Sequence, residues 1–217
     1  MFKVQVKLGS LNNGLKCRKS VFMRVSGICF IEWLWFGSIC GESNSKIKEQ
    51  IMKKIIILRG NSGSGKTTVA RALQKKFGYN TMMISQDEIR RNILWVKDGV
   101  DTKALPLMIE LMKYGYEHCD VVILEGIMYD EWYSPLFKTA NELYGMDIYA
   151  YYFDIPFEET VRRHNTRDKK QEFGEEDMRR WWREKDFSSV FNEKIITSDI
   201  DADSIVEMIY IDSANEG

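Results

Sequence analysis

The sequence has few cysteines, almost no net charge and no internal repeats. Its four cysteines, which show no metal-ligand spacing, are Cys17, Cys29, Cys40 and Cys119. Such sparse usage argues against a disulfide framework and is typical of a reducing compartment, so we expect a cytoplasmic protein. The formal charge of −1, from 31 basic and 32 acidic residues, provides no overall attraction to nucleic acid or to a membrane surface. Any basic site must therefore be local.

The sequence also lacks an apolar run long enough to span a bilayer comfortably. Residues 28–39 follow several basic residues and superficially resemble a signal peptide or anchor, but the run is short and contains Glu32. We expect residues 1–51 to be a leader that is distinct from the main domain, residues 52–217. The leader is either translated upstream sequence, with the natural start at Met52, or a disordered or membrane-associating extension.

A complete phosphate-binding loop is the clearest feature that the sequence does contain. Residues 60–67 read GNSGSGKT and match the pattern G-x-x-x-x-G-K-[ST] at every fixed position. The β-branched run 55–58 before the loop predicts a buried parallel strand, and the apolar positions within 68–76 predict a helix after it. Glycines let the backbone turn its amides toward an anion, and the new helix adds its positive end.

The residue types of this loop predict its chemistry. We expect Lys66 to reach the terminal phosphates of ATP and the Thr67 hydroxyl to ligate Mg²⁺. The expected nucleotide-binding residues are consecutive: Gly60, Asn61, Ser62, Gly63, Ser64, Gly65, Lys66, Thr67 and Thr68. The loop indicates binding of a nucleoside triphosphate, but it does not identify the reaction.

Strand and helix patterns alternate from residue 51 onward, which predicts a parallel sheet covered on both faces. The expected strands are residues 55–58, 81–84, 121–124, 147–153 and 195–197. The expected helices are residues 68–76, 87–96, 103–118, 131–144, 157–165, 175–183 and 201–210. We therefore expect a three-layer α/β fold of the phosphate-loop NTPase or kinase type, with a five-stranded parallel sheet.

Acidic residues stand at the ends of expected strands, where open parallel sheets bind their ligands. Asp87 follows the second strand, and Arg90 lies one helical turn further on. A carboxylate that can accept a hydroxyl proton, beside an arginine that can hold an anion, predicts a phosphoryl-acceptor site; the alternative is that Asp87 caps a helix. Glu125 ends the third strand, and we expect it to organise Mg²⁺, through water, or to bind the acceptor. Asp154 is interpreted as a turn residue.

A local basic cluster, Arg162, Arg163 and Arg167, predicts a lid that bears arginines. Arg163 and Arg167 are four residues apart, so one helical face can direct both guanidinium groups at phosphate. Mixed charge around Gly174 suits a mobile segment. The alternative is a solvated charged face.

From residue 52 to the C-terminus the sequence resembles phosphate-loop phosphotransferases that include polynucleotide 5′-hydroxyl kinases, zeta-toxin sugar kinases and chloramphenicol phosphotransferase. Three motifs carry the resemblance besides the loop: Asp87-Glu88-Ile89-Arg90, Asp154-Ile155-Pro156 with Arg163 and Arg167, and Leu124-Glu125-Gly126. The first implies that Asp87 activates the acceptor and that Arg90 binds its phosphate. The second implies that Arg163 and Arg167 contact the donor phosphates, and the third that Glu125 helps to hold a sugar substrate. The stretch 173–182 belongs to neither pattern, so the acceptor stays open.

The sequence therefore predicts a kinase that uses ATP and Mg²⁺ and phosphorylates a hydroxyl of a small metabolite, nucleoside, sugar or nucleic-acid end. Lys66, Asp87, Arg163 and Arg167 are the expected catalytic residues, and nucleic acid is expected only as a 5′-hydroxyl end. No membrane partner is expected for the kinase domain. Two alternatives are a nucleotide-dependent regulatory module without an acceptor and a toxin that phosphorylates an amino-sugar nucleotide.

Overall fold

The computed structural model describes residues 23–25, 28–30, 53–166 and 173–214. The chain divides into two compact units, Met1–Lys48 and Glu49–Gly217. In the first unit, β1 (Met23–Val25) pairs antiparallel with β2 (Ile28–Phe30). The predicted start at Met52 lies outside the described residues, as does most of the predicted leader. Among the residues that the structure describes, no helix is both long and apolar enough to cross a membrane.

The second unit is built on a five-stranded parallel sheet, which confirms the predicted fold class. In spatial order its strands are β4 (Thr81–Ser85), β5 (Val121–Gly126), β3 (Lys54–Gly60), β6 (Ile148–Phe153) and β7 (Lys194–Ile196). The central strand β3 is buried on both faces, and its apolar side chains alternate between two hydrophobic clusters. Ile55 and Ile57 belong to one cluster, and Ile56 and Leu58 belong to the other.

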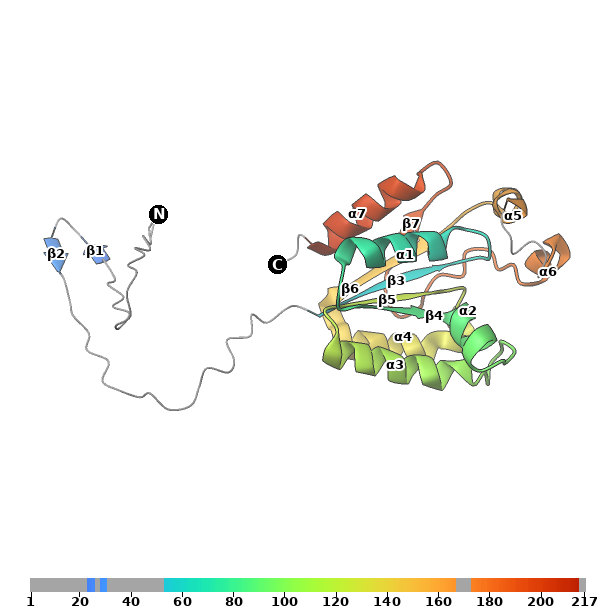
Figure 1. The fold of residues 1–217 in the computed structure, drawn as a ribbon, viewed down its shortest axis with the longest axis horizontal. Coiled ribbons are helices and arrows are strands. Elements are labelled where there is room, and N and C mark those ends of the chain that lie inside the picture. The colour runs from blue at the N-terminus through green and yellow to red at the C-terminus, as the bar shows by residue number, and fades with distance from the viewer. Residues whose placement is uncertain (1–22, 26–27, 31–52, 167–172, 215–217) are drawn as a thin grey trace. The chain divides into compact units, whose positions relative to one another are not determined.

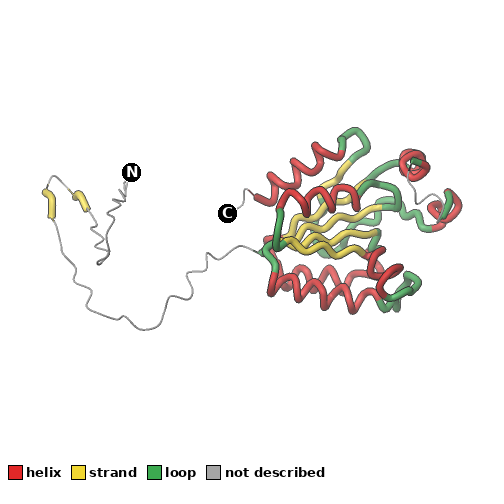
Figure 2. The backbone as a smooth tube through the Cα atoms, in the orientation of Figure 1, coloured by secondary structure: helices red, strands yellow, loops and turns green. Residues whose placement is uncertain are grey.

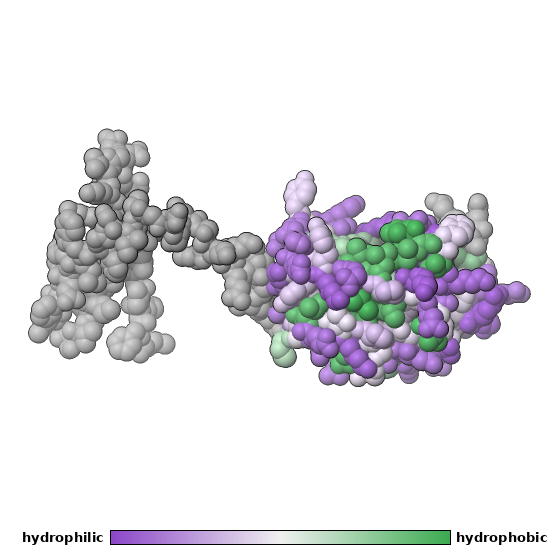
Figure 3. All heavy atoms as spheres, turned by 90° about the horizontal axis from the view of Figure 1, so that it is seen from below, coloured by the Kyte–Doolittle hydropathy of each residue, from purple (hydrophilic) through white to green (hydrophobic). Residues whose placement is uncertain are grey.

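Two pairs of helices cover the two faces of the sheet (Figures 1 and 2). On one face lie α1 (Lys66–Phe77) and α7 (Ala202–Ala214). On the other lie α3 (Ala104–His118) and α4 (Asp130–Tyr144). Figure 3 shows the outer surface on the side of α3 and α4, where hydrophobic residues gather among hydrophilic ones. Because all five strands are parallel, their carboxyl ends lie on one side of the unit.

Most of the remaining elements lie near those carboxyl ends: α2 (Gln86–Glu88), the π-helix η1 (Ile89–Ile93), α5 (Phe157–Asn165) and α6 (Glu175–Arg180). The 3₁₀ turn η2 (Gly145–Asp147) lies at the opposite, amino end of the sheet, directly before β6. The helix predicted over 87–96 is wrong in form, because wide π-type turns replace α-helical ones and Trp95 has a φ of 55°. The helix predicted over 175–183 ends early, and the closing helix predicted over 201–210 extends to Ala214.

Candidate active site

The phosphate loop lies where β3 ends and α1 begins, and two of its glycines pack closely against neighbouring backbone. Gly60 has a φ of 136°, and a Cβ there would lie 2.7 Å from the Phe153 carbonyl oxygen. Gly63 has a φ of 80°, and a Cβ there would lie 2.7 Å from the Thr160 carbonyl oxygen. Neither position accommodates a side chain without strain, so the curl of this loop depends on glycine.

The start of α1 has the features of an anion-binding helix end. Its first turn contains no acidic residue, and no side chain caps it at Gly65. The Lys66 side chain is buried and folds back over the loop, where Nζ donates to Asn61 O at 2.8 Å and to Ser64 Oγ at 3.1 Å. Because amides, the helix end and an ammonium group converge here, the loop suits a chain of phosphates.

Glu125 joins three elements through its buried carboxylate. The Thr67 hydroxyl on α1 donates to Glu125 Oε2 at 3.1 Å, and the Ser85 hydroxyl at the end of β4 donates to Oε1 at 2.5 Å. Sequence analysis missed Ser85. Hydroxyl and carboxylate oxygens are ligands that Mg²⁺ accepts, and one or two of them suffice where phosphates supply the rest. Thr67 and Glu125 therefore fit the expected Mg²⁺, with phosphate oxygens completing its coordination. A metal site made of protein side chains alone is a different case: among the described residues, no three or more His, Cys, Asp or Glu are grouped so that they could hold a metal ion.

A groove of about 580 Å³ opens beside this cluster, between α1 and the edge strand β4. Thr67, Ser85 and Glu88 line the part of the groove that is close to the Glu125 cluster. The groove gives a small molecule access to the hydroxyl groups that contact Glu125.

The two acceptor residues predicted after β4 contact each other. Arg90 Nη2 lies 3.0 Å from Asp87 Oδ1, and Arg91 Nε lies 3.5 Å from the same oxygen. Arg90 Nε is buried without a hydrogen-bond partner, and it lies 3.9 Å from Asp98 Oδ2. The helix cap at this point is Ser85, whose hydroxyl accepts from the Glu88 amide, so the Asp87 carboxylate does not cap the helix.

Gln86 anchors the short helix that carries Asp87, and sequence analysis missed it. Its buried Oε1 accepts from the amides of Ile127 and Met128, at 2.8 and 3.2 Å, in the loop after β5. Its Nε2 donates to Asp98 Oδ2 at 2.9 Å and to the Tyr133 hydroxyl at 2.8 Å. Burial and the Asp98 charge raise the pKa of Tyr133, which therefore stays a neutral donor. The network therefore holds the short helix that carries Asp87 against the loop after β5.

A second buried network begins at Arg59, the residue before the phosphate loop. Its guanidinium is wholly buried and lies 3.0 Å from Glu193 and 2.8 Å from Asp186, and it also donates to Met128 O. Burial raises the pKa of Glu193, while the Arg59 charge opposes that rise. Arg59 thus holds residues 186–193, which lead into β7, against the central strand β3. The signal in the sequence that could have identified Arg59 is its charge next to an apolar run in the predicted strand.

Of the two predicted lid arginines, the structure places one at the phosphate loop. Arg163 Nη1 donates to Ser64 O at 3.1 Å, and its Nε donates to Glu159 at 2.7 Å. Arg167 lies outside the described residues. His164 is buried, and its Nε2 lies 2.8 Å from Phe173 O. The arginine-bearing lid itself stays a prediction.

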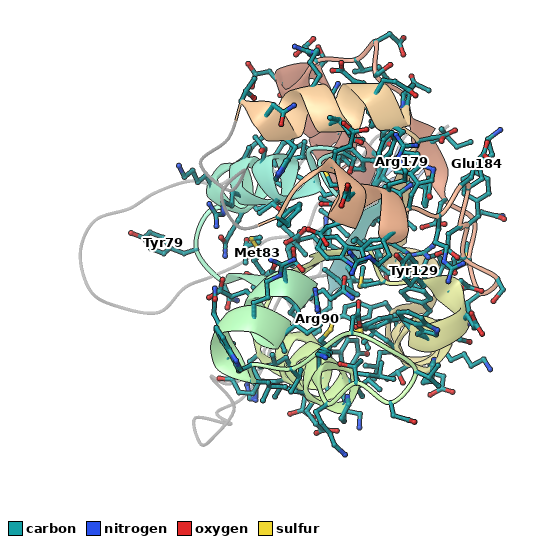
Figure 4. The ribbon with its side chains drawn as sticks, turned by 90° about the vertical axis from the view of Figure 1, so that its right-hand side faces the viewer. Tyr79, Met83, Arg90, Tyr129, Arg179 and Glu184 are labelled. Atoms are coloured by element: carbon teal, nitrogen blue, oxygen red, sulfur yellow. The ribbon has the colours of Figure 1, made fainter. Side chains whose placement is uncertain are left out.

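Figure 4 looks onto the carboxyl ends of the strands and shows how these groups surround one region. Arg90 stands beside α2 and η1, Tyr129 stands on the side of α4, and α6 lies above them. A phosphate loop, a buried carboxylate beside its threonine, and an acid–arginine pair at the next strand end together define a phosphate-loop kinase-like protein.

Comparison with known proteins agrees with this class. The AAA domain family (AAA_18) matches residues 56–182, and the chain belongs to this family. No curated protein matches the sequence significantly.

Two solved structures show the same fold. The tunicamycin resistance protein of Deinococcus radiodurans is 17% identical, with 75% of this chain and 96% of that chain covered and a TM-score of 0.52. The APS kinase of Mycobacterium tuberculosis, in complex with AMPPNP and APS, is 16% identical, with 73% and 96% covered and a TM-score of 0.51. The predicted resemblance to phosphate-loop kinases is thereby confirmed.

Proposed function

We propose that this protein is an ATP- and Mg²⁺-dependent kinase that transfers the γ-phosphoryl group to a hydroxyl of a small or nucleotide-like acceptor. The observation that carries the proposal is the contact between Thr67 of the loop and Glu125, with Asp87 two residues beyond Ser85 of the same cluster. A triphosphate on the loop would point its terminal phosphate toward this cluster. The catalytic unit comprises residues 52–217.

The proposed roles follow from where each side chain lies. Lys66 and the loop amides bind the triphosphate, and Thr67 and Glu125 would hold Mg²⁺, which neutralises phosphate charge when bound. The acceptor hydroxyl loses its proton to Asp87 as its oxygen bonds to the γ-phosphorus. The bond from that phosphorus to the β–γ bridging oxygen breaks, and ADP leaves with the electron pair.

The contact between Asp87 and Arg90 gives this proposal a testable order of events. When an anionic acceptor enters, Arg90 exchanges the Asp87 carboxylate for the acceptor's anion. Asp87, which keeps Arg91 Nε at 3.5 Å, then receives the hydroxyl proton. Arg163, together with Arg167 in the predicted lid, neutralises charge that develops on the transferred group.

The test is ATP turnover by the purified full chain, with and without a panel of acceptors. The panel contains nucleosides, sugars, amino-sugar nucleotides and 5′-hydroxyl oligonucleotides. We expect one class to stimulate turnover, and Asp87→Asn to lose about 10²- to 10⁴-fold of that turnover while it still binds ATP. Glu142→Gln, an exposed change on α4 away from the site, is the control.

Two results would overturn the proposal in different ways. Tight ATP binding with no effect of any acceptor would instead indicate a nucleotide-dependent regulatory module. Acceptor-dependent turnover that survives in Asp87→Asn would establish a kinase but remove Asp87 from its mechanism.

A further inference from the structure

Residue 183 is fixed at the phosphate loop by contacts to its main chain. Asn61 Nδ2 donates to Arg183 O at 2.6 Å, and the Arg183 amide donates to Asn61 Oδ1 at 3.1 Å. Asn61 is the second residue of the loop, and it is buried. These two bonds use both main-chain groups of residue 183, so they hold its backbone by contacts that do not involve its side chain.

The Arg183 side chain lies over an aromatic ring that is itself held in place. Its guanidinium carbon is 5.2 Å from the centroid of the Tyr129 ring. Tyr129 is buried, and its hydroxyl donates to the carbonyl oxygen of Trp181. An arginine that stacks on an aromatic face keeps the N–H groups at the rim of its guanidinium available to an anion.

In the described part of the chain, no carboxylate forms an ion pair with Arg183. Other arginines near the strand ends do have carboxylate partners: Arg59, Arg90, Arg163, Arg179 and Arg180. The Arg183 side chain is exposed, so it is open to a ligand. Arg183 thus combines a fixed position with an unneutralised charge.

The surroundings of Tyr129 put Arg183 on the acceptor side of the site. Tyr129 follows Met128, whose amide donates to Gln86, the residue before Asp87. Burial raises the pKa of Tyr129; the Arg183 charge and a hydrogen bond from the Arg183 side chain act to lower it, and the Asp98 and Asp186 charges act to raise it. These groups therefore lie near this phenol. Asp98 is also the neighbour of Arg90.

We propose that the Arg183 guanidinium binds an anionic group of the acceptor, in addition to the binding assigned to Arg90. This inference rests on the proposed kinase function and narrows the acceptor to hydroxyl compounds that carry a phosphate, sulfate or carboxylate. The γ-phosphate of ATP is the other possible source of the anion. We assign the acceptor because Tyr129 belongs to the loop after β5, whereas Arg163 already contacts the phosphate loop at Ser64.

The experiment titrates inorganic phosphate into the full chain saturated with Mg²⁺ and AMPPNP and follows binding by calorimetry. Arg183→Ala removes the guanidinium but keeps the main-chain bonds to Asn61, and Arg183→Lys keeps a charge without the planar fork. Arg180→Ala is the control, because Arg180 is an exposed arginine of the preceding helix, 3.0 Å from Asp177.

We expect phosphate to bind about 10- to 100-fold more weakly to Arg183→Ala than to wild type or Arg180→Ala, as for loss of a hydrogen bond to a charged group. Arg183→Lys should recover part of the affinity, and the affinity for AMPPNP should be unchanged. With an acceptor found by the panel, Arg183→Ala should raise KM by a similar factor. Equal urea midpoints for the two alanine variants would show that both are folded.

Three outcomes would overturn the inference. Phosphate that fails to bind wild type, or that binds Arg183→Ala as it binds Arg180→Ala, would show that Arg183 holds no anion. Weaker AMPPNP binding by Arg183→Ala would show that Arg183 binds a phosphate of the nucleotide, and it would refute the assignment to the acceptor. Phosphate binding that needs Arg183, with no turnover on any acceptor, would refute the kinase function and leave an anion site of another purpose.

Discussion

The Thr67 hydroxyl donates a hydrogen bond of 3.1 Å to Glu125, so the first turn of α1 is tied to the end of β5. Ser85 donates to the other oxygen of the same carboxylate from the end of β4. Because both oxygens accept from fixed hydroxyl groups, Glu125 is oriented before any ligand arrives. Preorganisation of this kind avoids reorganisation during phosphoryl transfer.

Replacing Glu125 by glutamine tests this arrangement. The amide has nearly the same shape, but it lacks the charge and cannot accept from both hydroxyl groups, so we expect turnover to fall about 10- to 100-fold and the Mg²⁺ requirement to rise. Titration of Mg²⁺ against ATP turnover measures both effects. Glu142→Gln, an exposed change on α4, is the control. An unchanged Mg²⁺ dependence would separate Glu125 from the metal.

Alanine at Gly63 should distort the phosphate loop. The new Cβ would lie 2.7 Å from the Thr160 carbonyl oxygen, at a φ of 80° that side chains rarely adopt. We expect a loss of about 1–3 kcal/mol in the free energy of unfolding, together with weaker AMPPNP binding. Gly174→Ala is the matched control, since a Cβ there meets nothing within 4 Å. Urea unfolding and calorimetry measure the two effects, and equal results for both variants would contradict the close packing of Gly63.

Arg59→Met should destabilise the protein strongly. The change leaves two carboxylates, Asp186 and the buried Glu193, without their cation, and removing one partner of a buried ion pair typically costs about 3–5 kcal/mol. Urea unfolding measures the change, with exposed Arg162→Met as the control. A second change, Glu193→Gln, should restore part of the loss. If Arg59→Met is as stable as the control, the buried pair contributes nothing net.

Glu159 provides a pH-dependent prediction. Hydrogen bonds from Arg162 and Arg163 lower the pKa of Glu159 from 4.5 to about 2. Because the folded state has the lower pKa, the stability from ionised Glu159 is fully present above about pH 4.5 and is lost as the pH falls toward 2. An NMR titration of the Glu159 carboxyl carbon measures this pKa, and Arg162→Gln should raise it. An ordinary value in wild type would mean that these contacts do not persist in solution.

The sequence predicted the sheet and the phosphate loop well, because both depend on local patterns. The β-branched run 55–58 is typical of a buried strand, and the glycines of the eight-residue motif that begins at Gly60 favour the turn that follows it. The ends of two helices near the site, predicted at residues 96 and 183, were missed for a different reason. Trp95 follows a π-helix that no periodicity shows, and the chain after Arg180 is held by Asn61, which is distant in sequence.

The residues of the candidate site also differ in whether a local pattern or a contact distant in sequence identifies them. Asp87, Arg90 and Glu125 were proposed from their places at strand ends, and the structure brings Asp87 and Arg90 into contact and sets Glu125 against Thr67. Gln86 and Arg59 were missed because their importance depends on partners elsewhere in the chain. Those partners include Asp98 and Tyr133 for Gln86, and Asp186 and Glu193 for Arg59. Only the folded chain shows that they meet.

The bonds from Asn61 to the peptide groups of residue 183 have a consequence for evolution and engineering. Every residue except proline can make both main-chain hydrogen bonds, so residue 183 can be exchanged while they persist. At the anion site that we propose, this position would therefore set the preferred charge: a glutamate would favour cationic compounds, and a leucine neutral ones. Proteins that share these two hydrogen bonds from Asn61 could change their substrates by single substitutions at residue 183, without first acquiring compensating changes elsewhere.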